Sequence, residues 1–150
     1  MIAAAYIDTS ALLRLFFEGE DSNLVAQAIQ NTVTLYASRL VLSEARVTFA
    51  RGLREGRMSP DDYRESLDGL DDFWEGEIQP LEIEEAVFQS AERVAERVAI
   101  RTLDAIHLGH ARMLRRELAM TGKLAIISCD RRLLQAAATL GFETPIPPDF

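Results

Sequence analysis

Residues 2–13 read IAAAYIDTSALL, an apolar hexapeptide that ends at an aspartate and continues directly into a helical pattern. The run at 2–7 is short and uncharged and is followed by a turn, which is typical of a strand buried on both faces of a parallel sheet. A second stretch, LAIISCDRRLLQAAA at 124–138, repeats the order of apolar run, acid and helix. We therefore expect buried parallel strands at 2–7 and 124–128, each followed by a helix.

The rest of the chain alternates helical and extended patterns. The segment SPDD at 59–62 has a capping serine, a proline at the first helical position and acids in the first turn, so it predicts a helix start. Helices are expected at 11–17, 23–31, 40–55, 60–75, 84–99, 103–120 and 131–140, and short strands at 34–37, 78–81 and 142–144. This alternation predicts one α/β domain over residues 1–150, with three layers and a mostly parallel central sheet. Ligands of such sheets bind beyond the carboxyl ends of the strands.

The composition restricts the class of protein. With 150 residues, of which 48% are hydrophobic, the chain can bury a core of its own. It has no uncharged apolar run of transmembrane length and no signal-peptide pattern, and its one cysteine, Cys129, excludes an internal disulfide, so we expect a cytoplasmic protein with no membrane association. The net charge of −8 argues against broad, nonspecific nucleic-acid binding, although basic residues can still cluster locally.

Four carboxylates stand at predicted junctions between elements. Asp8 and Asp130 end the two apolar strands, and Glu44 and Asp104 lie near the starts of two long amphipathic helices. Each acid taken singly is explained by helix capping or by a solvated position. Together they would form one crowded negative pocket, which protons or a hard cation must neutralise. This predicts a site for Mg²⁺, or alternatively Mn²⁺, and such sites commonly act on phosphate esters.

Hydroxyl and imidazole groups lie close to these acids in the sequence. Thr9 or Ser10 could cap the first helix or bind a water or a phosphate oxygen, and Ser128 could support the last acid. His107 is expected to be a packed, hydrogen-bonded helix residue in preference to a metal ligand or general base. His110 is expected at the surface or in an interface.

Arginine supplies 15 of the 16 basic residues, and its planar fork suits phosphate contacts. The row formed by Arg93, Arg97 and Arg101 is expected to be a solvated helix face. The candidate phosphate contacts, chosen for their place near the strand ends, are Arg14, Arg39, Arg46, Arg51, Arg131 and Arg132.

Four motifs occur in a characteristic order: DTSALL at 8–13, SE at 43–44, LDAIHL at 103–108 and SCDRRLLQAA at 128–137. Over essentially its whole length the chain resembles the PIN domain family, and in length and layout the VapC toxins of toxin–antitoxin pairs. The resemblance implies a three-layer PIN-like fold whose sheet has about five strands. It implies a magnesium- or manganese-dependent endoribonuclease that forms a homodimer and binds a small antitoxin protein. Its acidic positions fall on Asp8, Glu44, Asp104 and Asp130, and its hydroxyl positions on Ser10, or Thr9, and Ser128.

Three other interpretations remain open. A non-catalytic PIN-like module would bind RNA or protein without cutting. A phosphatase or dehalogenase would use Asp8 as a covalent nucleophile, but such sites usually have a second acid two positions later, where this chain has Ser10. Finally, the four acids could be helix caps that never converge.

Overall fold

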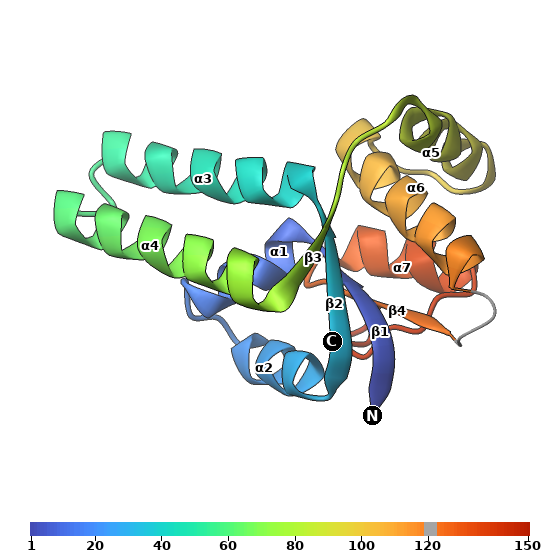
Figure 1. Cartoon of the computed structure of the whole chain (residues 1–150), viewed down its shortest axis with the longest axis horizontal. Coiled ribbons are helices and arrows are strands. Elements are labelled where there is room, and N and C mark those ends of the chain that lie inside the picture. Colours follow the sequence, from blue (N-terminus) through green and yellow to red (C-terminus); the bar gives the residue numbers. More distant parts are fainter. Residues whose placement is uncertain (119–122) are drawn as a thin grey trace.

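The computed structural model describes residues 1–118 and 123–150 (Figure 1). The strands are β1 (Ile2–Ile7), β2 (Thr32–Ser38), β3 (Ile78–Leu81) and β4 (Leu124–Ile127). The helices are α1 (Thr9–Leu12), the 3₁₀ turn η1 (Leu13–Leu15), α2 (Ser22–Gln30), α3 (Arg39–Arg54), α4 (Pro60–Glu77), α5 (Glu85–Arg97), α6 (Thr102–Glu117) and α7 (Arg131–Thr139). The helix expected at 103–120 is confirmed to Glu117, and its expected end at 120 lies outside the described residues.

The sheet has the order β3-β2-β1-β4, and every pairing is parallel. The predicted three-layer α/β/α fold is therefore confirmed. The expectation of about five strands is wrong for the described residues, which form four. The segment at 142–144 adds only an isolated bridge between Glu143 and Ala125, because Pro145 follows it and cannot donate to a longer ladder.

Alternation along the strands fills the two faces of the sheet. Ala5 and Ile7 of β1 pack with α1 to α4, whereas Tyr6 lies in a second cluster with side chains of α5, α6 and α7. Figure 1 shows the consequence: α3 and α4 lie side by side on one flank, α5 and α6 lie on the other, and the strands end between them. The carboxyl edge of the sheet is thus the place where both helix layers meet.

Several helix starts follow from local side-chain caps. Ser59 Oγ accepts a hydrogen bond from Asp62 N, and Pro60 occupies the first turn of α4, as its sequence predicts. The first helix begins at Thr9, two residues earlier than expected, because Asp8 is the cap and accepts from Ala11 N. That helix also tightens into a 3₁₀ turn after Leu12.

Helices α5 and α6 approach so closely that Gly109 has no room for a side chain. A Cβ added there would lie 2.7 Å from Ala91 N and 3.1 Å from Val87 O, both backbone atoms of α5. The Ser90 hydroxyl also donates to Gly109 O at 2.9 Å, which fixes the two helices against each other. The glycine is therefore required by packing, at the expense of helix propensity.

We predict that Gly109→Ala lowers the free energy of unfolding by roughly 1–3 kcal/mol, because the helices must separate. Gly76→Ala on α4 is the matched control, since nothing lies within 4 Å of its added Cβ. In the control, the free energy of unfolding should rise by up to about 1 kcal/mol, because alanine has a higher helix propensity than glycine. Urea titrations followed by circular dichroism measure both, and equal stabilisation of the two variants would contradict the close approach.

None of the helices in residues 1–118 and 123–150 combines the length and the apolar character that crossing a membrane requires.

Candidate active site

Asp8 lies at the carboxyl end of the central strand β1 and is only 4% exposed. Its backbone N–H continues the sheet by donating to Ile127 O at 3.1 Å. The Ser10 hydroxyl lies 2.8 and 2.9 Å from the two carboxylate oxygens, the Ser128 hydroxyl donates to Oδ2 at 2.8 Å, and Ala11 N donates to Oδ1 at 3.0 Å. Burial raises the pKa of Asp8, while attraction to His107 and these hydrogen bonds oppose the rise. Asp8 is thus a helix cap and also a buried, well-oriented carboxylate.

The two predicted strand-acid-helix junctions are connected by hydroxyl groups. Ser10 Oγ and Ser128 Oγ lie 3.2 Å apart, and Cys129 N donates to Ser10 Oγ at 2.9 Å. Asp130 N donates to Ser128 Oγ at 3.0 Å, and Asp130 Oδ1 caps α7 by accepting from two backbone N–H groups. Because β1 and β4 are neighbours, their terminal acids lie at one edge of the sheet.

Glu44 is held by a buried chain of hydrogen bonds from the opposite helix layer. Tyr6 Oη lies 2.7 Å from His107 Nδ1, and His107 Nε2 lies 2.8 Å from Glu44 Oε1. Ser38 N donates to Tyr6 Oη, and His107 Nε2 donates to Glu44, because an ionised carboxylate oxygen can only accept.

Burial and these hydrogen bonds also determine whether Tyr6 and Glu44 are ionised. Burial raises the pKa of Tyr6 well above its usual value, so the phenol stays neutral. Burial alone would raise the pKa of Glu44, but the hydrogen bonds from His107 and Thr9 outweigh it and lower the pKa. Glu44 is therefore ionised and oriented.

Asp104 lies in the first turn of α6, with 19% of its side chain exposed. Burial and then repulsion from Asp130 raise its pKa, and Glu44 adds to the rise. His107 and Arg101 partly offset these effects. The interactions with Asp130 and Glu44 place Asp104 within electrostatic range of both.

Charge interactions connect the predicted acids: Asp104 is repelled by Asp130 and Glu44, and His107 interacts with Asp8, Glu44 and Asp104. In residues 1–118 and 123–150, however, no three His, Cys, Asp or Glu side chains are arranged so that they could hold an ion. The donor chemistry fits a hard divalent cation, because the four acids offer only oxygen atoms.

The six arginines predicted to contact phosphate differ in their availability. Arg14 and Arg46 form ion pairs with Asp21 and Asp71. Arg39 donates to Ser43, and Arg131 donates twice to Phe150 O. Among the described residues, Arg51 and Arg132 form no ion pair.

The sequence-based interpretation of the two histidines is half right. His107 is packed and hydrogen-bonded, as expected. His110 is only 4% exposed, so its expected surface position is wrong, and burial lowers its pKa to about 4. Tyr6 was missed as a site residue. The signal was a tyrosine in the apolar run at 2–7, because a buried phenol hydroxyl needs a partner.

The fold and the site define a three-layer α/β/α protein with acidic residues at the carboxyl edge of a parallel sheet. The PIN domain model matches residues 5–139. The chain is similar to "Ribonuclease VapC47" of Mycobacterium tuberculosis, with 34% identity over 147 residues that cover 95% of this chain and 96% of the relative. The chain belongs to the PIN domain family.

Solved structures have the same fold. One is a "Toxin-antitoxin complex from Klebsiella pneumoniae", with TM-score 0.63, 20% identity, and coverage of 95% of this chain and 98% of that chain. Another is Mycobacterium tuberculosis VapC20, described as a "Sarcin-Ricin loop cleaving toxin", with TM-score 0.64, 12% identity, and coverage of 92% and 95%.

Proposed function

We propose that the protein is a divalent-metal-dependent endoribonuclease and the toxin of a type II toxin–antitoxin pair. The observation that carries the proposal is the buried carboxylate of Asp8, oriented by two hydroxyls at the strand end that Glu44, Asp104 and Asp130 also face. Similarity to a relative named as a ribonuclease supports RNA as the substrate.

Asp8, Glu44 and Asp104 would hold one Mg²⁺ or Mn²⁺ ion, and Asp130 would hold a second ion or position the attacking water. A bound ion would lower the pKa of water and offset charge on the reacting phosphate. Ser10 and Ser128 fix Asp8, and His107 with Thr9 fixes Glu44, so the ligands are oriented before substrate arrives. In-line attack on the phosphodiester would leave a 5′-phosphate and a 3′-hydroxyl.

The proposal includes protein partners and a location. The structural neighbour from Klebsiella pneumoniae is a toxin–antitoxin complex, which supports a small antitoxin whose basic side chain pairs with these carboxylates. A homodimer belongs to the same proposal, and the exposed Phe88 (42%) and Leu103 (50%) of the α5–α6 layer offer apolar surface for one. The proposed place of action is the cytoplasm.

The absence of a preformed ion cage in the described residues favours one competing function, a PIN-like module that binds RNA or protein without cutting. Measuring the affinity for a divalent metal distinguishes the ribonuclease from this passive module. Covalent catalysis by Asp8 is disfavoured, because this chain has Ser10 where such sites usually have a second acid.

The test combines calorimetry with RNA cleavage. We expect Mn²⁺ to bind the wild type with millimolar or tighter affinity, because closely placed carboxylates repel one another until a cation joins them. Asp104→Asn should abolish this binding. Wild-type protein with Mg²⁺ should cut RNA to 5′-phosphate ends, and chelation should stop it. Asp68→Asn, an exposed carboxylate on α4, controls for the change in charge. A wild type that neither binds Mn²⁺ nor cuts RNA would favour the passive module.

A further inference from the structure

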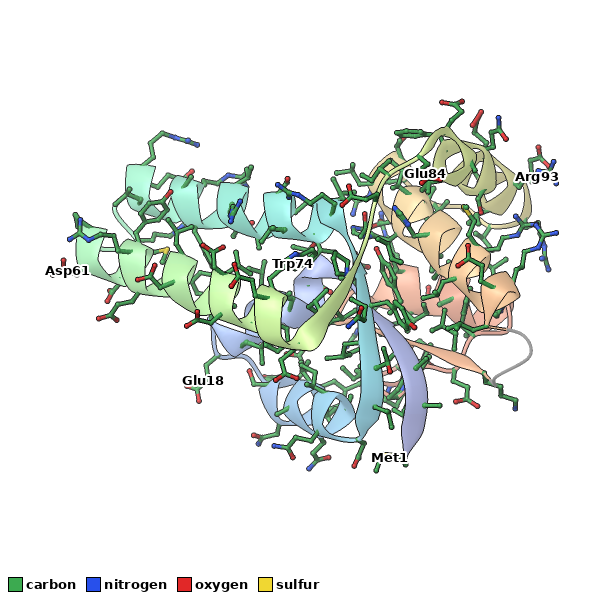
Figure 2. The ribbon with its side chains drawn as sticks, in the orientation of Figure 1. Met1, Glu18, Asp61, Trp74, Glu84 and Arg93 are labelled. Carbon is green, nitrogen blue, oxygen red and sulfur yellow. The ribbon has the colours of Figure 1, made fainter. Side chains whose placement is uncertain are left out.

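The negative charge of the protein is concentrated in one helix. The segment 60–77, which forms α4, has eight acidic residues and one arginine, and so carries most of the net charge of −8. Figure 2 shows the acidic tips along α4, with Asp61 at its far end, away from Arg93 and the α5–α6 layer. The overall charge therefore does not describe the surface on the opposite flank, where an anionic ligand could bind.

A groove of about 660 Å³ lies on that opposite flank, between the α5–α6 connection and α7. Three arginines line it, Arg97, Arg101 and Arg132, and it reaches Asp104. A second hollow, of about 390 Å³, is lined by Arg101, Asp104 and Glu44 among others. Because both hollows share Arg101 and Asp104, the groove leads into the candidate active site.

The arginines of the groove are available to a ligand. Among the described residues Arg97 and Arg132 form no ion pair, and the Arg101 side chain is 74% exposed, with Nε 3.9 Å from Asp104 Oδ2. Arg14 and Arg46, in contrast, are already neutralised by Asp21 and Asp71. A guanidinium group can form two parallel hydrogen bonds with phosphate oxygens. Arg97 and Arg132, which form no ion pair within the described residues, and Arg101, whose ion pair with Asp104 is long, are therefore better placed for phosphate than Arg14 and Arg46.

The rest of the lining suits a nucleotide more than an acidic peptide. Gln135 and Thr139 of α7 present an amide and a hydroxyl, which can bond to base edges and to the ribose 2′-hydroxyl. Val98 and Ile100 are half-buried and add apolar surface for a base.

We propose that this groove binds the backbone of single-stranded RNA beside the scissile phosphate, with Arg97, Arg101 and Arg132 on its phosphates. The proposal rests on the proposed ribonuclease function and adds to it the path of the substrate. It also reassigns Arg97 and Arg101 from a solvated row to the substrate groove, since both line it.

The test compares Arg97→Gln/Arg132→Gln with Arg93→Gln/Arg116→Gln, a control pair that removes the same charge from exposed arginines of α5 and α6 outside the groove. Binding of a short fluorescent single-stranded RNA is measured by anisotropy in EDTA over a range of salt concentrations, without cleavage. The double variant Arg97→Gln/Arg132→Gln, called the groove pair, should bind RNA roughly fivefold more weakly for each arginine removed. It should also reduce the slope of log Kd against log salt by about 0.7 per arginine, whereas the control pair should change little. In Mg²⁺, KM should rise more than kcat falls.

The outcomes separate this proposal from the ribonuclease itself. Wild-type cleavage of RNA with equal binding by the groove pair and the control pair would overturn the groove and leave the enzyme. Displacement of labelled RNA by poly-glutamate as efficiently as by unlabelled RNA of equal charge would overturn RNA as the ligand and indicate an acidic protein. Loss of affinity in the groove pair, together with RNA binding that resists poly-glutamate, supports the proposal even if cleavage is absent.

Discussion

Asp8→Asn should reduce RNA cleavage by about 10³-fold or more, the loss typical of removing a central catalytic group. Asparagine keeps the shape of the side chain and can still accept from Ala11 N, so the cap of α1 remains. What disappears is one negative charge, and with it one of the three ligands proposed for the ion. Product formation under single-turnover conditions measures the effect, and Asp68→Asn should cleave like the wild type.

The same substitution should make the metal-free protein more stable. Burial raises the pKa of Asp8 in the folded state, so its contribution to stability is fully present below its unfolded pKa and is lost as pH rises through the folded pKa. In EDTA the Asp8→Asn variant should therefore unfold at a higher temperature than the wild type near neutral pH, and the gap should close in acid. Mg²⁺ should raise the unfolding temperature of the wild type only. Retained cleavage, or a variant less stable than the wild type in EDTA, would contradict our interpretation.

His107→Leu should lower kcat about 10- to 100-fold with little change in KM, which is the usual cost of removing a group that orients a metal ligand. The imidazole is 3% exposed, so it cannot contact RNA, and the acid that it hydrogen-bonds is Glu44. The variant should also lose roughly 1–3 kcal/mol of stability, because the buried Tyr6 hydroxyl loses its imidazole partner. Steady-state kinetics and urea unfolding measure the two effects.

A double variant separates positioning from folding. Tyr6→Phe/His107→Leu removes both partners, so the buried polar group that destabilises the single variant is gone and stability should largely recover. Cleavage should stay low, because Glu44 still has no donor from His107. If activity returned together with stability, His107 would be only a structural residue.

Much of this protein follows from local sequence. An apolar run, an acid and a helical pattern at 2–13 and again at 124–138 predict strand, cap and helix, because each of these depends on residues close together in the chain. Parallel strands then bring Asp8 and Asp130 to one edge, since carboxyl ends of such strands always meet there. The order of the elements and the region of the candidate site could be predicted from the sequence in this way.

The number of strands and the ends of the helices were harder to predict from the sequence. The segment 142–144 is extended and partly apolar, but only tertiary pairing could decide that it adds a single bridge. The start of α1 at Thr9 depended on whether Asp8 or a neighbouring hydroxyl made the cap, and all three residue types are good caps.

The tertiary structure alone decided which groups complete the site. Tyr6 and His107 are 101 positions apart, and His107 and Glu44 are 63 apart, so no local pattern connects them. The close contact at Gly109 and the pairing of Arg14 and Arg46 away from the substrate groove are likewise properties of packed surfaces. Local sequence specifies elements through hydrogen bonds and periodicity within a few residues. Orientation and availability of a side chain depend on whichever distant element packs against it.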